Sequence, residues 1–405
     1  MLKGFKIRLF PTKEQEEKLW KSVGTARWVW NWGLNFRIEL YKNEGKSIGS
    51  YDLKKEFTKV RNSEGMEWLK EVSAKVASTA IFDLDEAYKA FYRIAKKGQK
   101  AGFPKFKSRG KSKPSFGLDV QTVIFYKDGV QLQKIGHVKY KSELGPLHDI
   151  PDLKIYNTRI QHTQNDKWIL SFSTEIPEQV LKLHSYSVGI DLGVKTLAVV
   201  SCEGKFYKAK NINRSYKLVR LEKQLKHHQR ALSRKKKASK NRKKALKKVQ
   251  KTYSRISNIR HDYTHKTTTK VVNMLPQRIV IEDLNVQGMM KNRHLAKAVS
   301  QQNFYKFRSQ LEYKCKERGI ELKAADKFFP SSKTCSNCGR VKQELKLSDR
   351  IYKCECGLVL DRDENASRNL EKVVYNNQGI PNDPVACGES YQSVIHGGIH
   401  ERQRF

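Results

Sequence analysis

Four cysteines lie close together near the carboxyl end of this 405-residue chain. Two residues separate the first pair, one residue separates the second pair, and fifteen residues lie between the pairs. Four thiolates at this spacing suit one tetrahedral zinc ion, and a glycine directly after each pair allows a tight turn. Because the protein supplies all four ligands, the predicted site is structural and not catalytic. The predicted zinc ligands are Cys335, Cys338, Cys354 and Cys356.

Three acidic residues form a second group of chemical interest. Asp191 ends the apolar run VGID, Glu282 ends RIVIE, and Asp363 opens a predicted helix after the second cysteine pair. A carboxylate at the end of a buried strand is costly to desolvate unless a cation lies against it. Carboxylates are the ligands that Mg²⁺ prefers, and two such ions can assist phosphodiester chemistry. Other interpretations stay open from spacing alone: Asp191 as a turn residue, Asp283 as the polar strand end, and Asp361 or Asp363 as a helix N-cap.

The charge of the chain points to the class of partner. Lys and Arg number 81 against 41 Asp and Glu, which leaves a formal net charge of +40 and argues against an ordinary metabolic enzyme. Such an excess needs a polyanion, and nucleic acid is the default. The charge is spread along the chain, unlike that of a membrane-surface protein, and no run of about 20 apolar residues predicts a membrane helix. Without a signal peptide at the N-terminus, we expect a cytoplasmic protein with no membrane partner.

Several enzyme classes leave no motif in the sequence. We find no P-loop, no G-x-S-x-G and no dinucleotide fingerprint, which excludes the common NTPase, esterase and Rossmann classes. His261 and His265 flank Asp262 in a near match to the H-E-x-x-H zinc motif. The acid is one methylene too short and no third ligand is evident, so we do not favour a zinc hydrolase.

The first half of the chain must supply a scaffold of strands and helices. Residues 3–10 alternate like a strand, and the capping-box pair Thr12 and Gln15 predicts the start of a helix. Apolar residues at three- and four-residue steps predict a long helix over about 67–95. Short alternating runs with hairpin turns over 116–176 predict a β-rich module that the first strand joins. The helical part is then an insertion in a small β-barrel.

A basic, aromatic loop connects these two parts. Residues 96–113 hold eight basic residues and no acid, with Phe103 and Phe106 between them. Glycines and prolines in this stretch disfavour regular structure. Such a loop suits contact with backbone phosphates and stacking on bases. Its candidate nucleic-acid contacts are Lys105, Lys107 and Arg109.

The second half of the chain begins a new domain near residue 186, with a strand, a turn and a second strand. Residues 214–248 hold 16 Lys and Arg against one Glu, with leucines at helical spacing, which predicts a helical hairpin with a basic tip. A helix is predicted over 301–319. Beyond residue 378 no periodicity remains, so we expect a disordered tail.

Taken in order, the segments GIDLG, VIEDLN, FPSSKTCSNCG, the second cysteine pair and DRDENASRN resemble the TnpB (OrfB) family of insertion-sequence nucleases. These proteins are compact relatives of type V CRISPR effectors. The resemblance covers residues 1–375 and includes RLFPTKEQ, AGFPKFKSR and RHDYTHK. It implies an α+β multidomain protein in which a wedge β-barrel carries a helical recognition insertion. A RuvC-like nuclease of RNase H fold follows, with an inserted zinc ribbon.

The resemblance implies boundaries for these domains. The expected ranges are 1–30 and 116–185 for the wedge barrel, 31–115 for the recognition domain, 186–329 and 359–378 for the RuvC-like nuclease with its basic hairpin, 330–358 for the zinc ribbon, and 379–405 for the tail.

The resemblance also assigns roles to single residues. Asp191, Glu282 and Asp363 fall on the family's three metal-binding catalytic acids, and the match selects Asp363 over Asp361. The implied cofactors are two Mg²⁺ or Mn²⁺ ions held by these acids and one structural Zn²⁺ ion held by the four cysteines. The residues implied to read a short motif on target DNA are Tyr51, Lys75 and Thr79.

The function implied by the resemblance is an RNA-guided DNA endonuclease encoded by a transposon. Its partners would be a guide RNA from the transposon end and double-stranded target DNA, with one chain per guide RNA, in the prokaryotic cytosol. Guided recognition leaves sequence to base pairing, which fits a diffuse basic charge. The alternatives are a transposase that joins DNA, a guided regulator that does not cleave, and a basic zinc-bearing RNA-binding protein. Retention of all three acids argues against the last two.

Overall fold

The computed structural model describes residues 2–141, 153–175, 181–326, 329–346 and 348–373. The chain divides into two compact units, Met1–Pro177 and Glu178–Phe405, each with its own core. The tail predicted beyond residue 378 lies outside the described residues. Within the described part, no helix combines the length and apolar character needed to cross a membrane.

The first unit is built on a seven-stranded sheet of order β2-β6-β7-β1-β5-β4-β3, in which neighbouring strands are antiparallel. The first strand pairs with β5 and β7, so it joins the β-rich module as predicted. The Asp128-Gly129 turn connects β3 to β4. Closure of this sheet into a barrel stays a prediction. The strands are β1 (Leu2–Phe10), β2 (Ser115–Gly117), β3 (Val123–Phe125), β4 (Val130–Leu132), β5 (Gly136–Lys141), β6 (Ile155–His162) and β7 (Trp168–Glu175).

The α-helices among the described residues of the first unit are α1 (Lys13–Glu44), α2 (Ser50–Asn62) and α3 (Ala74–Ala95). The predicted capping box is present at the start of α1. This helix spans residues 30 and 31, where a domain boundary is expected, without a break, and buried residues recur along it as far as Arg37. The third helix begins at Ala74, later than predicted, because the Ser73 side chain caps it by accepting a hydrogen bond from the Lys75 N–H.

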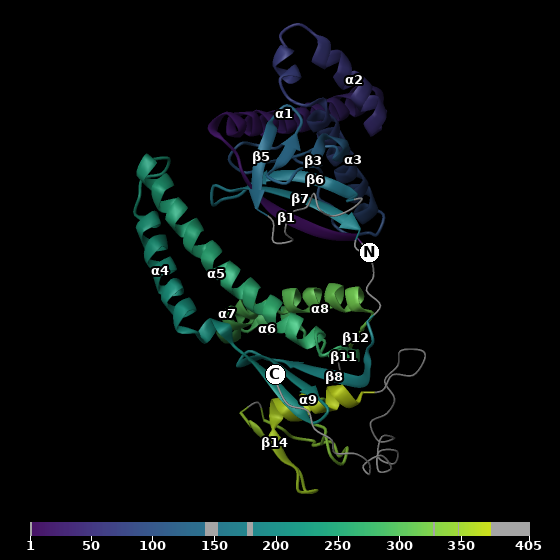
Figure 1. Ribbon diagram of the computed structural model, residues 1–405, viewed down its shortest axis with the longest axis vertical. Helices are drawn as coiled ribbons and strands as arrows, with labels where there is room; N and C mark the ends of the chain where they lie inside the picture. The colour runs from purple at the N-terminus through teal and green to yellow at the C-terminus, as the bar shows by residue number, and fades with distance from the viewer. Residues whose placement is uncertain (1, 142–152, 176–180, 327–328, 347, 374–405) are drawn as a thin grey trace. The chain divides into compact units, whose positions relative to one another are not determined.

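The second unit contains a five-stranded mixed sheet of order β10-β9-β8-β11-β12. Its strands are β8 (His184–Leu192), β9 (Thr196–Cys202), β10 (Lys205–Lys210), β11 (Pro276–Ile281) and β12 (Glu321–Ala324). The strand β8 is antiparallel to β9 and parallel to β11. The helices α5 (Lys240–Val272) and α8 (Phe304–Arg318) lie on one face of the sheet, and α9 (Arg362–Lys372) lies on the other (Figure 1).

The predicted helical hairpin is formed by α4 (Tyr216–Ser233) and α5, and it extends away from the five-stranded sheet (Figure 1). The connecting tip over 234–239 is basic, as predicted. An ion pair of 2.8 Å between Arg260 and Glu222 ties the base of the two helices together. Two short helices, α6 (Val286–Lys291) and α7 (Arg293–Gln302), then lead to α8.

The cysteine-rich segment forms a small module before α9. Its second cysteine pair is framed by a two-stranded hairpin, β13 (Ile351–Lys353) and β14 (Val359–Asp361). The chain passes from β14 directly into α9, so the module and this helix are continuous.

Candidate functional site

Parallel strand pairing brings Asp191 and Glu282 together. Ile190 lies opposite Ile281 in the register of β8 and β11, and the Glu282 N–H donates to the Ile190 carbonyl at 3.3 Å. Side chains alternate between the faces of a sheet. Because Ile190 and Ile281 belong to the core beneath α5 and α8, the residues that follow them face the other side, where α9 lies.

The third acid reaches this face from α9. A Cβ atom built on Gly189 would overlap the backbone of Ser367 and Glu371, so glycine in GIDLG allows the helix to lie against β8. Asp363 is in the first turn of α9. The Asp361 side chain caps the helix by accepting hydrogen bonds from the Asp363 N–H (2.9 Å) and the Glu364 N–H (3.4 Å). Asp361 is therefore the N-cap, and the carboxylate of Asp363 is left for other contacts.

The three carboxyl groups influence one another strongly. Burial first, and then the charges of Glu282 and Asp363, raise the pKa of Asp191 well above its usual range. Burial also raises the pKa of Glu282 and of Asp363. A hydrogen bond between the Asp191 and Glu282 carboxyl groups also contributes to the raised pKa of Asp191. The charge of Asp363 thus acts on both other acids, and a divalent cation bound beside the three would offset it.

The donor set fits a hard cation. Mg²⁺ takes oxygen ligands and is usually bound through one or two carboxylates, with water completing the shell. All three acids are half-buried, so they retain some access to solvent. The residues that would hold Mg²⁺ are thus Asp191, Glu282 and Asp363.

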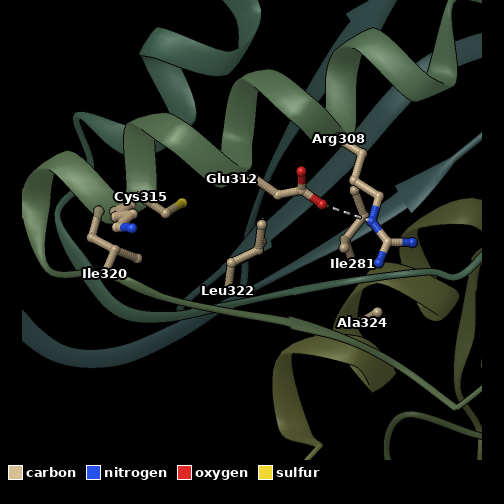
Figure 2. A pocket seen from close by; sticks show the side chains of 8 residues that line it. Ile281, Arg308, Glu312, Cys315, Ile320, Leu322 and Ala324 are labelled. Carbon is tan, nitrogen blue, oxygen red and sulfur yellow. Dashed lines mark hydrogen bonds and ion pairs between the residues drawn. The ribbon is translucent and has the colours of Figure 1, made fainter. Parts of the chain in front are cut away.

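Asp283 points away from this group. Its carboxylate is paired with Arg308 of α8 at 2.8 Å, on the opposite face of the sheet from Asp363. Arg308 in turn donates to Glu312, as Figure 2 shows. Arg308 and Glu312 line a cavity of about 370 Å³ that none of the three acids lines. The alternative in which Asp283 takes the place of Glu282 is therefore not supported.

Arg362 is a member of the site that the sequence analysis missed. Its guanidinium lowers the pKa of each of the three acids and so opposes their mutual repulsion. It is held by donating to the Lys346 carbonyl (2.9 Å) and the Ser332 hydroxyl (3.4 Å). Arg362 directly precedes Asp363 in the sequence, and this position could have indicated that its side chain lies near the acids.

The four predicted zinc ligands come together as one cluster. Their sulfur atoms all lie within 4.8 Å of one another. Among the described residues, this is the one group of three or more His, Cys, Asp or Glu side chains whose ligand atoms come so close together. Gly339 and Gly357 both have positive φ (74° and 88°), and their N–H groups donate to the Cys335 and Cys354 carbonyls. The geometry of four thiolates fits a closed tetrahedral Zn²⁺ site.

The near match to a zinc hydrolase motif forms no comparable cluster. Asp262 is exposed and paired with Lys266 at 2.9 Å, while the rings of His261 and His265 contact each other. This arrangement gives no support to a catalytic zinc site on α5.

The residues expected to read a motif on DNA lie in the first unit, near one face of α3. Lys75, Thr79 and Phe82 follow each other at helical spacing, and the Tyr51 ring contacts Phe82 with centroids 5.7 Å apart. Tyr51 is 74% exposed. Lys75 is paired with Asp119 at 2.8 Å, so a phosphate would compete with this carboxylate.

The basic loop is anchored on α1. Asn31 donates to the Lys107 carbonyl (2.9 Å) and accepts from the Lys107 N–H (2.7 Å), and Trp30 donates to the Lys105 carbonyl. The Lys107 ammonium lies 3.5 Å from the centre of the Trp30 ring, and burial lowers its pKa to about 8. Lys105 and Arg109 are exposed. These two are thus better placed than Lys107 to meet a polyanion.

Comparisons with known protein families match three segments of the chain. The model described as "Probable transposase" (OrfB_IS605) matches residues 171–293, and that described as "Cas12f1-like, TNB domain" matches 304–370. A model described as "Helix-turn-helix domain" matches 1–46. In this structure the segment matched by the helix-turn-helix model consists of the strand β1 followed by one continuous helix, α1.

The chain is also similar to whole proteins. It is 32% identical to a Streptomyces pristinaespiralis protein named "Putative RNA-guided DNA endonuclease", over 91% of this chain and 88% of that one. It is 29% identical to "Putative RNA-guided DNA endonuclease InsQ" of Escherichia coli K12, over 97% and 95%. Its fold is similar to the protein in a solved Cas12f1–sgRNA–target DNA complex, with a TM-score of 0.58 and 13% identity over 93% of this chain and 99% of that one. With this length of similarity and the ordered motifs described above, the chain belongs to the TnpB (OrfB) family.

Proposed function

We propose that this protein is an RNA-guided DNA endonuclease that cleaves double-stranded DNA next to a short adjacent motif. The observation that carries the proposal is the convergence of Asp191, Glu282 and Asp363 on one face of the second unit's sheet. Relatives over nearly the whole length carry names of RNA-guided DNA endonucleases, which supports the same activity. The net charge of +40 fits a load of RNA and DNA.

In this proposal the three acids hold two Mg²⁺ ions in a RuvC-like site. When bound, such ions supply electrostatic stabilisation of the attacking and leaving oxygens of the phosphodiester. The acids bind and orient the ions, and Arg362 balances the negative charge of the group. The four cysteines hold one structural zinc ion. One such site would cut the two DNA strands in turn.

The first unit would contact the nucleic acids. Tyr51, Lys75 and Thr79 are proposed to meet the adjacent motif on the duplex, and the exposed Lys105 and Arg109 to meet phosphates. Base pairing with the guide would specify the target, which leaves the protein to hold backbones and the short motif. We propose one chain per guide RNA.

The test begins with sequencing of the RNA that co-purifies with the protein from cells that carry its flanking DNA. We expect one dominant species with a constant structured part and a 3′ segment that extends past the transposon end. The complex is then offered matched DNA with Mg²⁺, beside an Asp191→Asn variant. Cleavage by the native complex, with RNA and DNA binding but no cleavage by the variant, is expected. Random cellular RNA and no guided cleavage would overturn the proposal.

A transposase is the second candidate, and the "Probable transposase" description of the matching family model favours it. A transposase needs the same acidic chemistry but joins DNA ends as well as cutting them. Assays for strand joining on DNA that carries both transposon ends distinguish the two functions. Joined products that depend on Asp191 would favour the transposase, and cleaved products alone would favour the nuclease.

A further inference from the structure

The cysteine module and the proposed nuclease site are joined through α9. Cys335 and Cys338 lie in a loop of residues 331–340, which we call the first knuckle. Two asparagines of α9, Asn365 and Asn369, point into it, and they are 0% and 6% exposed. Buried side-chain amides must find hydrogen-bond partners, so both contribute to the docking of the helix.

Asn365 makes the more specific contact. Its oxygen accepts from the Ser336 N–H at 2.9 Å, and its nitrogen donates to the Thr334 carbonyl at 2.7 Å. These two backbone groups flank Cys335, the first cysteine of the cluster. A single side chain therefore holds the backbone on both sides of a zinc ligand.

Neighbouring residues strengthen the contact along one face of α9. Asn369 donates to the Ser331 and Thr334 carbonyls, both at 2.7 Å. Lys372 donates to the Ser336 carbonyl at 2.6 Å. Positions 365, 369 and 372 follow helical spacing, so they lie on one face of the helix, and this face contacts the first knuckle. The other side of the helix lies against the sheet at Gly189.

The start of α9 is tied to the second cysteine pair as well. Asp361 is both the last residue of β14 and the N-cap of the helix, and it pairs with Ile351 across the hairpin. The first turn, which carries Asp363, is thus linked to one cysteine pair by the chain and to the other by Asn365. Without the amide of Asn365, the first turn would keep its connection through β14, the Arg362 hydrogen bonds and the Glu364–Lys208 ion pair, but it would lose its two hydrogen bonds to the backbone beside Cys335.

We propose that Asn365 is a positioning residue, which transmits the fold of the first knuckle to Asp363 and so sets the geometry of the acidic site. The inference rests on the proposed function. It explains why a zinc module would lie next to a nuclease site: the module would hold the helix that carries Asp363. The amide acts through the helix and does not contact the reacting atoms. Residues that orient a metal ligand in this way are worth about 10–100-fold in metal affinity or activity.

The test compares Asn365→Ala with Glu371→Gln in the full chain bound to its guide RNA. Glu371 is the matched control, because it anchors the same helix to the sheet, where it accepts from the Ser201 hydroxyl and from the Glu203 N–H. Three quantities are measured: zinc per chain, hydrogen exchange of the amides of residues 363–369, and the Mg²⁺ concentration for half-maximal cleavage.

We expect Asn365→Ala to retain its zinc, to exchange these amides faster, and to need about 10–100-fold more Mg²⁺. Glu371→Gln should lower thermal stability with little change in the Mg²⁺ requirement. If Asn365→Ala loses zinc or fails to fold, Asn365→Ser replaces it, since the serine side chain is neutral and too short to bridge the Ser336 N–H and the Thr334 carbonyl.

Two results would overturn the inference. One is unchanged exchange and Mg²⁺ requirement in a zinc-loaded Asn365 variant, and the other is an equal rise in the Mg²⁺ requirement with Glu371→Gln. If the native protein does not cleave DNA at all, the proposed nuclease function fails. The exchange of residues 363–369, and Mn²⁺ binding measured by calorimetry, then still decide whether Asn365 positions Asp363.

Discussion

The Glu282 N–H donates a hydrogen bond of 3.3 Å to the carbonyl of Ile190, the residue before Asp191. This bond continues the parallel pairing of β8 and β11 by one step. Two acids that are distant in the chain are thereby placed side by side at the ends of adjacent strands. The next residue, Asp283, faces the opposite side and meets Arg308.

This alternation predicts opposite outcomes for two neighbouring acids. Glu282→Gln should reduce cleavage by about 100-fold or more, because loss of a metal ligand removes several kcal/mol of transition-state stabilisation. Asp283→Asn breaks an exposed ion pair worth about 0–1 kcal/mol and should leave cleavage nearly unchanged. Single-turnover cleavage by the two guide complexes measures the difference. Equal losses would show that the site is not built on Glu282.

Gly189→Ala should displace α9 from the sheet. The new methyl group would overlap the backbone of Ser367 and Glu371, and backbone cannot move aside as a flexible side chain can. We expect a loss of about 1–3 kcal/mol of stability and a loss of cleavage, measured by thermal unfolding and by the cleavage assay. Gly24→Ala in α1 is the control, because nothing lies near its added methyl group. Native-like cleavage by Gly189→Ala would contradict this helix position.

Cys338→Ser should abolish zinc binding. Removal of one of four thiolates from a closed tetrahedral site weakens it greatly, and the module depends on the metal for its fold. Elemental analysis should show about one zinc per native chain and almost none in the variant. Cys202→Ser, which alters a half-buried cysteine outside the cluster, should keep its zinc. Zinc retained by Cys338→Ser would exclude this residue as a ligand.

We expect Lys107 to make a pH-dependent contribution to the free energy of unfolding. Its pKa is about 8 in the folded protein, against the usual 10.5, because the ammonium is partly buried. Between these values the unfolded chain binds more protons than the folded protein, so the contribution of Lys107 to the unfolding free energy rises with pH. Lys107→Met removes this dependence.

The excess stability of Lys107→Met over the native protein should therefore be largest near pH 7 and shrink as the pH rises above 8. Thermal unfolding of both proteins across this range measures it. Lys105→Met, which alters an exposed lysine of the same loop, is the control variant. A constant difference for Lys107→Met would mean that the ammonium is not desolvated.

Much of the local structure followed from the sequence, because short-range interactions decide it. The capping box of Thr12 and Gln15, the two knuckle glycines and the basic hairpin tip are all present where the spacing predicts them. The start of α3 was misplaced, because apolar spacing extends beyond the point at which Ser73 caps the helix. The domain boundary expected at residue 30 falls within α1, and it stays a prediction.

Composition and spacing thus determined the class of partner, the cysteine cluster and the candidate acids, because charge balance and local ligand spacing can be read along the chain. The tertiary structure alone decided that Asp191 and Glu282 meet and feel the charge of Asp363, that Asp361 is the N-cap, and that Arg362 offsets their charge. It also decided that Asn365 joins the first knuckle to α9. These relationships depend on strand pairing and helix docking between distant segments, and no local pattern encodes which faces meet.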